Sequence, residues 1–122
     1  MRKYVLFGAI PLCAAAGLLL STALAHEPVE VKLTEWKLGF KEISAKGGEI
    51  RFEIENVGTV EHAFEVEGEN GGQKVEYKSP VLKPGEKTTL QVDLPAGEYE
   101  AYCPVHDHKD KGMVGAVTVG AM

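Results

Sequence analysis

Cysteine is scarce in this chain of 122 residues, which contains only Cys13 and Cys103. Cys13 lies in an apolar segment at the N-terminus that we expect to be removed, so Cys103 stands alone in the remaining chain. Many small exported domains depend on disulfides because their cores are small. A disulfide within this chain is therefore excluded, and the lone cysteine needs another reason to be present.

The first 25 residues differ in composition from the rest. An apolar stretch follows Arg2-Lys3 and ends at Ala23-Leu24-Ala25. A basic start, an apolar middle and an A-x-A end are typical of a secretory signal peptide, here cleaved after Ala25. The segment is also about long enough to span a bilayer, so an uncleaved N-terminal membrane anchor is the alternative. We expect cleavage and a periplasmic or extracellular protein.

Basic residues are in the minority once that segment is set aside. It takes two of the 13 Lys and Arg residues and none of the 18 Asp and Glu residues, which leaves 11 against 18 and a net charge of −7. Such a surface repels phosphate backbones and anionic lipids, so nucleic acid and membrane surfaces are excluded as main partners. Residues 26–122 are enough for one small domain and too few for two.

Long stretches of helical periodicity are absent, and alternation of apolar and polar residues takes their place. It appears in six runs: 29–33, 50–54, 62–66, 90–94, 99–103 and 117–119. Turn-forming residues separate the runs, as at Gly47-Gly48 and Pro84-Gly85. Short strands with one apolar face each predict an all-β fold, a sandwich or a small barrel. We expect the least regular stretch, Gly68–Ser79, to form a long loop, and a short helix is the alternative.

Two residues able to bind metals fall on the inward phases of these runs. His62 shares its phase with Phe64, and Cys103 shares its phase with Tyr99. A single buried histidine or cysteine is more often a packing residue than a ligand. The only tryptophan, Trp36, is likewise expected to pack in the core and not to line a ligand site.

The loop that follows Cys103 favours metal binding over a packing role for these residues. It runs to Met113 and contains His106 and His108, so a thiol, two imidazoles and a thioether lie within one loop, while His62 adds an imidazole from an earlier strand. Thiolate and thioether are soft donors that suit Cu(I), and imidazole also suits Cu(II). Two histidines and a cysteine in a plane, with a weakly bound axial methionine, form the blue-copper arrangement.

Zinc is the competing metal, and the donor set argues against it. Structural zinc sites use four Cys or His ligands, often in C-x₂₋₄-C pairs, and catalytic zinc keeps one position open for water. Only Cys103 is available here, and Met113 is a poor zinc ligand that fills the position water needs. The single cysteine also excludes a binuclear copper centre bridged by two thiolates.

These motifs resemble, in type and order, those of the cupredoxins, the type-1 blue copper proteins of the plastocyanin and azurin type. Tyr102–Val105, His108 and Gly112–Val119 are similar to the C-terminal copper loop and last strand of that family, with a rusticyanin-like loop length. Asn56–Phe64 looks like the segment that supplies the first histidine ligand. The resemblance implies a Greek-key β-sandwich, single-electron transfer, and one copper ion. The ligands it implies are His62, Cys103, His108 and Met113.

The choice of loop histidine rests on spacing. His108 lies five residues after Cys103 and five before Met113, which is similar to the rusticyanin-like loop at both intervals. His106 lies three residues after Cys103, a spacing that occurs in plastocyanins, but it leaves a slack segment before Met113. We predict that His108 is the ligand, and His106 is the alternative.

The chain departs from its relatives at two places. Many relatives have a hydrogen-bonding side chain directly after the first histidine ligand, where this chain has Ala63. Support of the kind that orients metal ligands must then come from elsewhere. Relatives with this loop length also tend to have Pro-Gly before the loop histidine, whereas here His106-Asp107 stands there and makes the surrounding surface more charged.

Acidic residues gather between positions 53 and 76, where seven of them accompany Lys74 alone. Five fall on outward phases: Glu53, Glu55, Glu61, Glu65 and Glu67. A solvated strand face is the simpler explanation. The functional alternative is an acidic surface that steers a basic redox partner toward the protein.

We therefore expect an exported monomer that carries single electrons between redox partner proteins and acts on no small-molecule substrate. A copper-binding module for copper delivery, storage or sensing would use the same ligands and is the alternative. An enzyme with a Cys-His nucleophile would need an orienting third residue and a substrate cleft, and the sequence offers evidence for neither.

Overall fold

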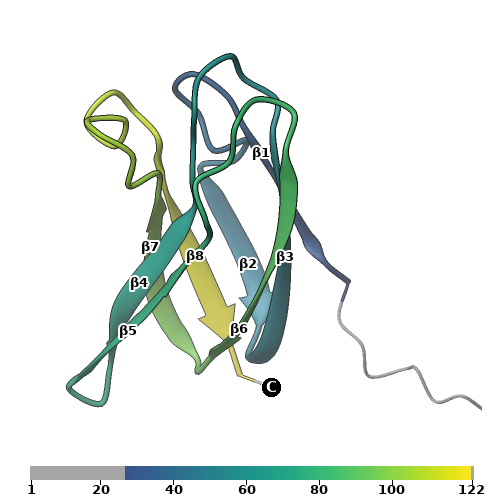
Figure 1. Ribbon diagram of the computed structural model, residues 1–122. Helices are drawn as coiled ribbons and strands as arrows, with labels where there is room; N and C mark the ends of the chain where they lie inside the picture. Colours follow the sequence, from purple (N-terminus) through teal and green to yellow (C-terminus); the bar gives the residue numbers. More distant parts are fainter. Residues whose placement is uncertain (1–26, 122) are drawn as a thin grey trace, which may run out of the picture.

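Residues 27–121 are described by a computed structural model, in which they form eight strands in two sheets (Figure 1). The strands are β1 (Val29–Leu33), β2 (Glu42–Lys46), β3 (Gly48–Asn56), β4 (Glu65–Asn70), β5 (Gln73–Lys78), β6 (Lys87–Leu94), β7 (Gly97–Tyr102) and β8 (Val114–Gly120). The predicted signal peptide, residues 1–25, lies outside the described residues. Between residues 27 and 121, no helix is long and apolar enough to cross a membrane.

The strands divide into a three-stranded sheet, β1-β3-β6, and a five-stranded sheet, β2-β8-β7-β4-β5. β1 runs parallel to β3 and β2 parallel to β8, while the other neighbours are antiparallel. The chain changes sheet at the β1–β2, β2–β3, β3–β4, β5–β6 and β6–β7 connections. Such connections between two packed sheets are typical of Greek-key sandwiches, and the prediction of an all-β Greek-key sandwich is confirmed.

The inner faces of the two sheets enclose the core. Ile50, Phe52 and Ile54 alternate along β3 and are all buried, as the period-two pattern predicts. The ring of Phe52 lies 5.0 Å from that of Phe64, which precedes β4 in the other sheet, so this pair joins the layers. Each such side chain, once fully buried, stabilises the fold by about 1.5–3 kcal/mol.

The stretch Gly68–Ser79 is not a long loop, and that expectation is wrong. β4 and β5 pair as an antiparallel hairpin in which Asn70 stands opposite Gln73. The two residues between them, Gly71 and Gly72, have φ values of 61° and 80°. This left-handed geometry suits two-residue hairpin turns, and glycine adopts it without strain. β5 lies at the sheet edge, and few apolar side chains mark the pairing in the sequence.

Glu65 is a second departure, because it is only 3% exposed although its phase points outward. β4 lies between β5 and β7, where Lys78 and Tyr102 flank Glu65 on the neighbouring strands. The side chains of Glu76 and Tyr102 contact its carboxyl and shield it from solvent. Burial raises the pKa of the Glu65 carboxyl above its usual value.

The elements that carry the predicted ligands meet at one end of the sandwich. Leu33 at the end of β1 pairs with Asn56 at the end of β3, so the segments that follow both strands leave the sheet side by side. Tyr102 pairs with Val114, which places both ends of the β7–β8 connection at one point of the sheet. Figure 1 shows this connection at the top of the molecule, away from the β4–β5 turn and the C-terminus.

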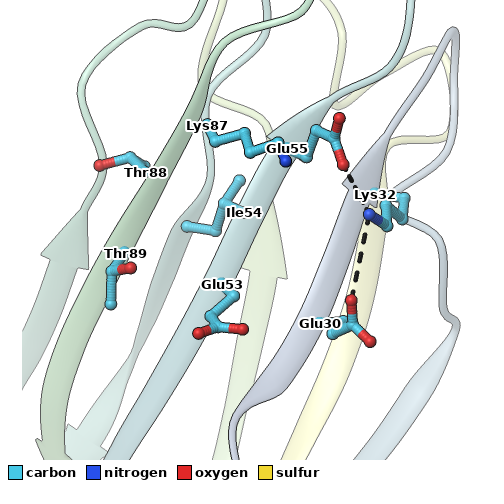
Figure 2. Close-up of a pocket in the computed structure, with 8 residues that line it drawn as sticks. All are labelled: Glu30, Lys32, Glu53, Ile54, Glu55, Lys87, Thr88 and Thr89. Carbon is cyan, nitrogen blue, oxygen red and sulfur yellow. Dashed lines mark hydrogen bonds and ion pairs between the residues drawn. The ribbon is translucent and has the colours of Figure 1, made fainter.

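The outer face of the three-stranded sheet carries a shallow pocket lined by charged and hydroxyl side chains (Figure 2). Lys32 Nζ lies 2.6 Å from a carboxylate oxygen of Glu55 and 4.0 Å from one of Glu30. Such exposed ion pairs contribute little to stability. None of the residues that line this pocket is a histidine, cysteine or methionine, so it offers no soft metal donor.

Candidate metal centre

His62 lies in the β3–β4 connection, and its side chain is completely buried. The backbone N–H of His62 donates to the carbonyl of Leu82 at 3.1 Å, and the backbone N–H of Leu82 donates back to the carbonyl of His62 at 2.7 Å. The side-chain amide of Asn56 donates to the carbonyls of Val60 and Leu82, at 2.8 and 2.9 Å, and so ties the preceding turn to the same segment. These bonds fix the backbone from which the imidazole projects.

The β7–β8 connection supplies the remaining predicted donors. Cys103 follows β7 and Met113 precedes β8, and the N–H of Cys103 donates to the carbonyl of Met113 at 3.1 Å. The N–H of Met113 in turn donates to the carbonyl of His108 at 3.2 Å. The loop is thereby closed at its base, where all three side chains are buried.

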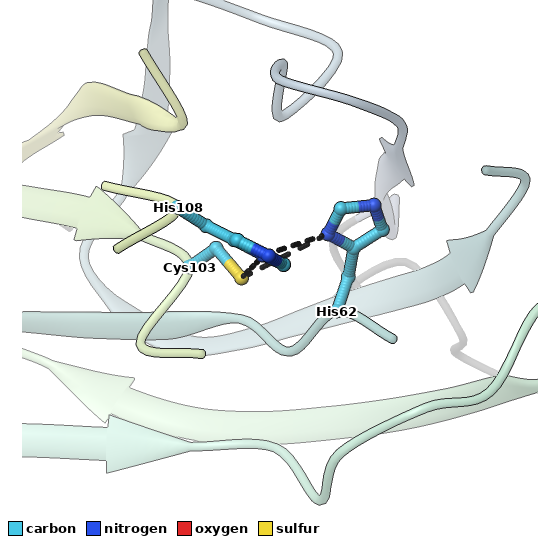
Figure 3. A group of neighbouring side chains, drawn as sticks. All are labelled: His62, Cys103 and His108. Carbon is cyan, nitrogen blue, oxygen red and sulfur yellow. Dashed lines mark hydrogen bonds between the residues drawn. The ribbon is translucent and has the colours of Figure 1, made fainter. Parts of the chain in front are cut away.

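Three of these side chains point at one another (Figure 3). Nδ1 of His62 lies 3.3 Å from Nδ1 of His108, and Sγ of Cys103 lies 4.0 Å from the first nitrogen and 3.5 Å from the second. His62, Cys103 and His108 form the one group with a thiol among the described residues whose donor atoms all lie within 4.8 Å of one another.

This spacing fits a metal ion. Two donors that each lie about 2.0–2.3 Å from one metal are separated by roughly 3.3–4.0 Å at trigonal or tetrahedral angles, which is the range found here. One thiol and two imidazoles, with the buried thioether of Met113 on the same loop, suit copper better than zinc. Cys103 is a free and buried cysteine, so its thiol is available to a metal ion.

The surroundings favour the neutral thiol of Cys103 and the neutral imidazole of His108. Burial raises the pKa of the Cys103 thiol, while hydrogen bonds from the N–H groups of Ala63 and Val105 act in the opposite direction. Burial lowers the pKa of His108, and the neighbouring imidazole of His62 lowers it further. At neutral pH His108 is therefore uncharged and has a free lone pair.

Support for the donors comes from residues that sequence analysis did not select. The backbone N–H of Ala63 lies 3.4 Å from Sγ of Cys103, so the residue without a polar side chain still donates a hydrogen bond. Oε1 of Glu35 lies 2.9 Å from Nε2 of His62, on the side of the ring that faces away from the other donors. That contact is the main cause that lowers the pKa of Glu35 to about 2.

Trp36 borders the candidate site as well. Its ring lies 4.8 Å from that of His108 and 6.2 Å from that of His62, both in edge-on geometry. Lys111 Nζ, from the β7–β8 connection, lies over the indole ring at 4.3 Å from its centre. Trp36 does pack against the core as expected, but it also forms a wall beside both imidazoles.

His106 does not join the donor group. It is exposed, its ring lies 6.2 Å from that of His108, and its φ of 44° falls in the left-handed region. Histidine is among the residues that tolerate this region better than most. The structure thus brings His108 to His62 and Cys103 and leaves His106 at the surface.

The chain matches the model of a known protein family. The model of the cupredoxin-like domain matches residues 5–119 of this chain.

Solved structures of blue copper proteins share this fold. Dithionite-reduced auracyanin from Roseiflexus castenholzii is 19% identical, with a TM-score of 0.69 over 79% of this chain and 98% of its own. Auracyanin A from Chloroflexus aurantiacus, described as a "blue" copper protein, is 17% identical, with a TM-score of 0.64 over 77% and 100%. An oxidised amicyanin variant is 22% identical, with a TM-score of 0.56 over 80% and 87%.

Proposed function

Because the chain belongs to the cupredoxin-like family, we propose that it is an exported type-1 copper protein that carries single electrons between redox partners. The observation that carries the proposal is the buried group of one thiol and two imidazoles at the end of the sandwich. Copper is the cofactor, and the donor set suits both of its oxidation states.

We assign the copper to four side chains: His62 and His108 through Nδ1, Cys103 through Sγ, and Met113 through its thioether. The first three have the mutual distances of a common coordination shell. Met113 is proposed on its burial and on its two backbone bonds, which place it between Cys103 and His108. The alternative loop ligand, His106, is exposed and outside this group.

Bound copper supplies a one-electron couple, and the protein's part is to hold the donors still. The backbone bonds at Leu82, Val105 and Met113 and the packing of Trp36 limit the movement of the ligands. A site that changes little between oxidation states exchanges electrons without large rearrangement. Burial also keeps water away from the thiol, since Cys103 has no exposed surface.

Copper delivery, storage or sensing remains the competing function, because it would use the same donors. The two functions are separated by visible spectroscopy and cyclic voltammetry of the copper-loaded protein. An electron carrier shows an intense thiolate-to-Cu(II) band and cycles reversibly without losing metal. A colourless Cu(II) form, or release of copper to a chelator on each reduction, would contradict the proposal.

The acidic residues selected from the sequence do not form one surface, because Glu53 and Glu55 lie on the three-stranded sheet and Glu65 is buried. A different acidic surface is proposed as the docking site of a basic redox partner. Its members lie on one face of the five-stranded sheet: Glu67, Glu69, Glu76, Glu98 and Glu100. Lys74 and Lys109 are the basic residues that pair with them. This acidic surface extends toward the metal end at Tyr102, which precedes Cys103 in the chain. The hydroxyl of Tyr102 donates a hydrogen bond to Glu67 at 3.3 Å.

Neutralising this acidic surface should slow electron exchange with a cationic partner. We expect the double variant Glu69→Gln/Glu98→Gln to react several-fold more slowly with a cationic cobalt(III) complex at low ionic strength, because attraction between opposite charges speeds encounter. The rate is measured by stopped-flow absorption, and the effect should vanish at high salt. Equal slowing by Glu49→Gln/Glu53→Gln, which removes two charges from the three-stranded sheet, would show that no local surface is involved.

Replacement of Met113 by leucine should keep the site coloured and raise the reduction potential. Loss of a weak axial donor disfavours Cu(II) more than Cu(I). Each tenfold change in the ratio of the two affinities moves a one-electron potential by about 59 mV. Voltammetry of the wild type and the variant measures the change, and an unchanged potential would remove Met113 from the ligand set.

A further inference from the structure

Glu35 reaches the metal end of the sandwich through the pairing of two strands. It lies in a tight turn after β1, where the N–H of Thr34 donates to the carbonyl of Lys37 at 3.0 Å and the N–H of Lys37 donates back at 2.9 Å. Because β1 and β3 are parallel and end together, this turn lies beside the segment that follows Asn56. The carboxylate of Glu35 therefore meets the segment that carries His62.

The carboxylate is held by three N–H donors. Oε1 of Glu35 accepts hydrogen bonds from the backbone N–H groups of Thr59 and Val60, at 2.8 and 3.1 Å, and lies 2.9 Å from Nε2 of His62. The fit around it is close, since a Cβ added to Gly58 would collide with the carboxylate. One side chain of limited exposure thus links the 58–60 turn to the ring of His62.

This contact decides which nitrogen of His62 is free. An ionised carboxylate only accepts hydrogen bonds, so Nε2 of His62 must carry the proton that it donates to Glu35. In a neutral imidazole the other nitrogen then has the lone pair. That nitrogen is Nδ1, the atom that points toward Cys103 and His108.

We propose that Glu35 is a positioning residue of the metal centre. It fixes the tautomer and the orientation of His62, and its negative charge favours the oxidised state of bound copper and so lowers the reduction potential. The first part concerns the protein alone, whereas the second rests on the proposed function. The sign follows from Coulomb's law, because the oxidised site carries one more positive charge than the reduced site.

The first test uses the copper-free protein. Long-range ¹H–¹⁵N NMR spectra report which imidazole nitrogen carries the proton, and we expect His62 in the wild type to be the Nε2–H tautomer. Glu35→Ala removes the acceptor, so His62 should become a mixture of the two tautomers. Gly58→Ala should act in the same direction without removing a charge, because its Cβ displaces the flexible end of Glu35.

The second test uses the copper-loaded protein and separates charge from hydrogen bonding. Glu35→Gln keeps an oxygen that can accept from Nε2 of His62 but removes the charge. It should keep the Nε2–H tautomer and the visible band while the ratio of Cu(II) to Cu(I) affinity falls about tenfold, a rise in potential of about 59 mV for one electron. Glu49→Gln removes the same charge from an exposed position at the far end of β3 and should shift the potential far less.

The outcomes discriminate between the parts of the proposal. A wild-type tautomer distribution in both Glu35→Ala and Gly58→Ala would overturn the positioning role. A potential shift in Glu35→Gln no larger than that in Glu49→Gln would overturn the electrostatic role. If the wild type gives no blue site while the tautomer still depends on Glu35, the proposed electron-transfer function fails and the positioning role stands.

Discussion

Replacement of Cys103 by serine should abolish the intense visible absorption of the copper-loaded protein. The band requires a thiolate bonded to Cu(II), and Cys103 is the only thiol among residues 26–122. A serine hydroxyl at the same position is a harder and much less acidic donor, so it supplies neither the charge transfer nor the affinity for Cu(I). We expect complete loss of colour, measured as absorbance per bound copper.

The control for this variant is a check that it keeps the wild-type fold. Cys103 is fully buried at the end of β7, and its Sγ accepts a hydrogen bond from the N–H of Ala63. Serine is smaller and can accept the same bond, so circular dichroism and NMR spectra of the copper-free variant should match those of the wild type. A folded variant that kept its colour would show that the thiolate assignment is wrong.

The raised pKa of the Cys103 thiol gives the same variant a second readout. Burial favours the neutral thiol, so the copper-free protein holds a proton there at neutral pH that copper must displace. Apparent affinity should therefore rise as pH rises, until the pH passes the pKa of the thiol. Competition with a chelator at several pH values measures how the apparent copper affinity depends on pH. Cys103→Ser should lose the part of this dependence that comes from deprotonation of the thiol.

Most of the fold was predictable because its signals are local. The alternation along β3 and β7 placed Phe52, Ile54 and Cys103 inside, and all three are buried. His62 fell on the same phase as Phe64 and is buried as well. Such patterns need only the period of a strand and one apolar face. The ligand loop was equally visible, because its donors lie close together in the sequence.

The residues that sequence analysis missed depend on contacts between distant segments. Glu35 reaches His62 only because β1 pairs in parallel with β3, and nothing near Glu35 in the sequence announces that pairing. Glu65 is covered because β4 lies between two other strands. Trp36 was expected in the core, but its place beside His108 follows from the path of the turn after β1. Local periodicity carries no information on any of these neighbours.

Alanine at position 108 should destroy the blue site, whereas substitution of His106 should leave it intact. Nδ1 of His108 lies 3.5 Å from Sγ of Cys103 and 3.3 Å from Nδ1 of His62, so its removal takes away one of three converging donors. His106 is exposed, and its ring lies 6.2 Å from that of His108. We expect His108→Ala to lose the visible band and to bind Cu(II) at least tenfold more weakly (about 1.4 kcal/mol).

The comparison needs a His106 variant that does not disturb the loop. His106 has a φ of 44°, and alanine in the left-handed region costs more than asparagine, which tolerates it. His106→Asn is therefore the matched partner of His108→Ala, and it should keep both the visible spectrum and the copper affinity. The reverse result would be a colourless His106→Asn beside a blue His108→Ala. It would mean that the loop rearranges on metal binding and that His106, which is closer to Cys103 in the sequence, is the ligand. The buried position of His108, held between Trp36 and the backbone of Met113, argues against that rearrangement.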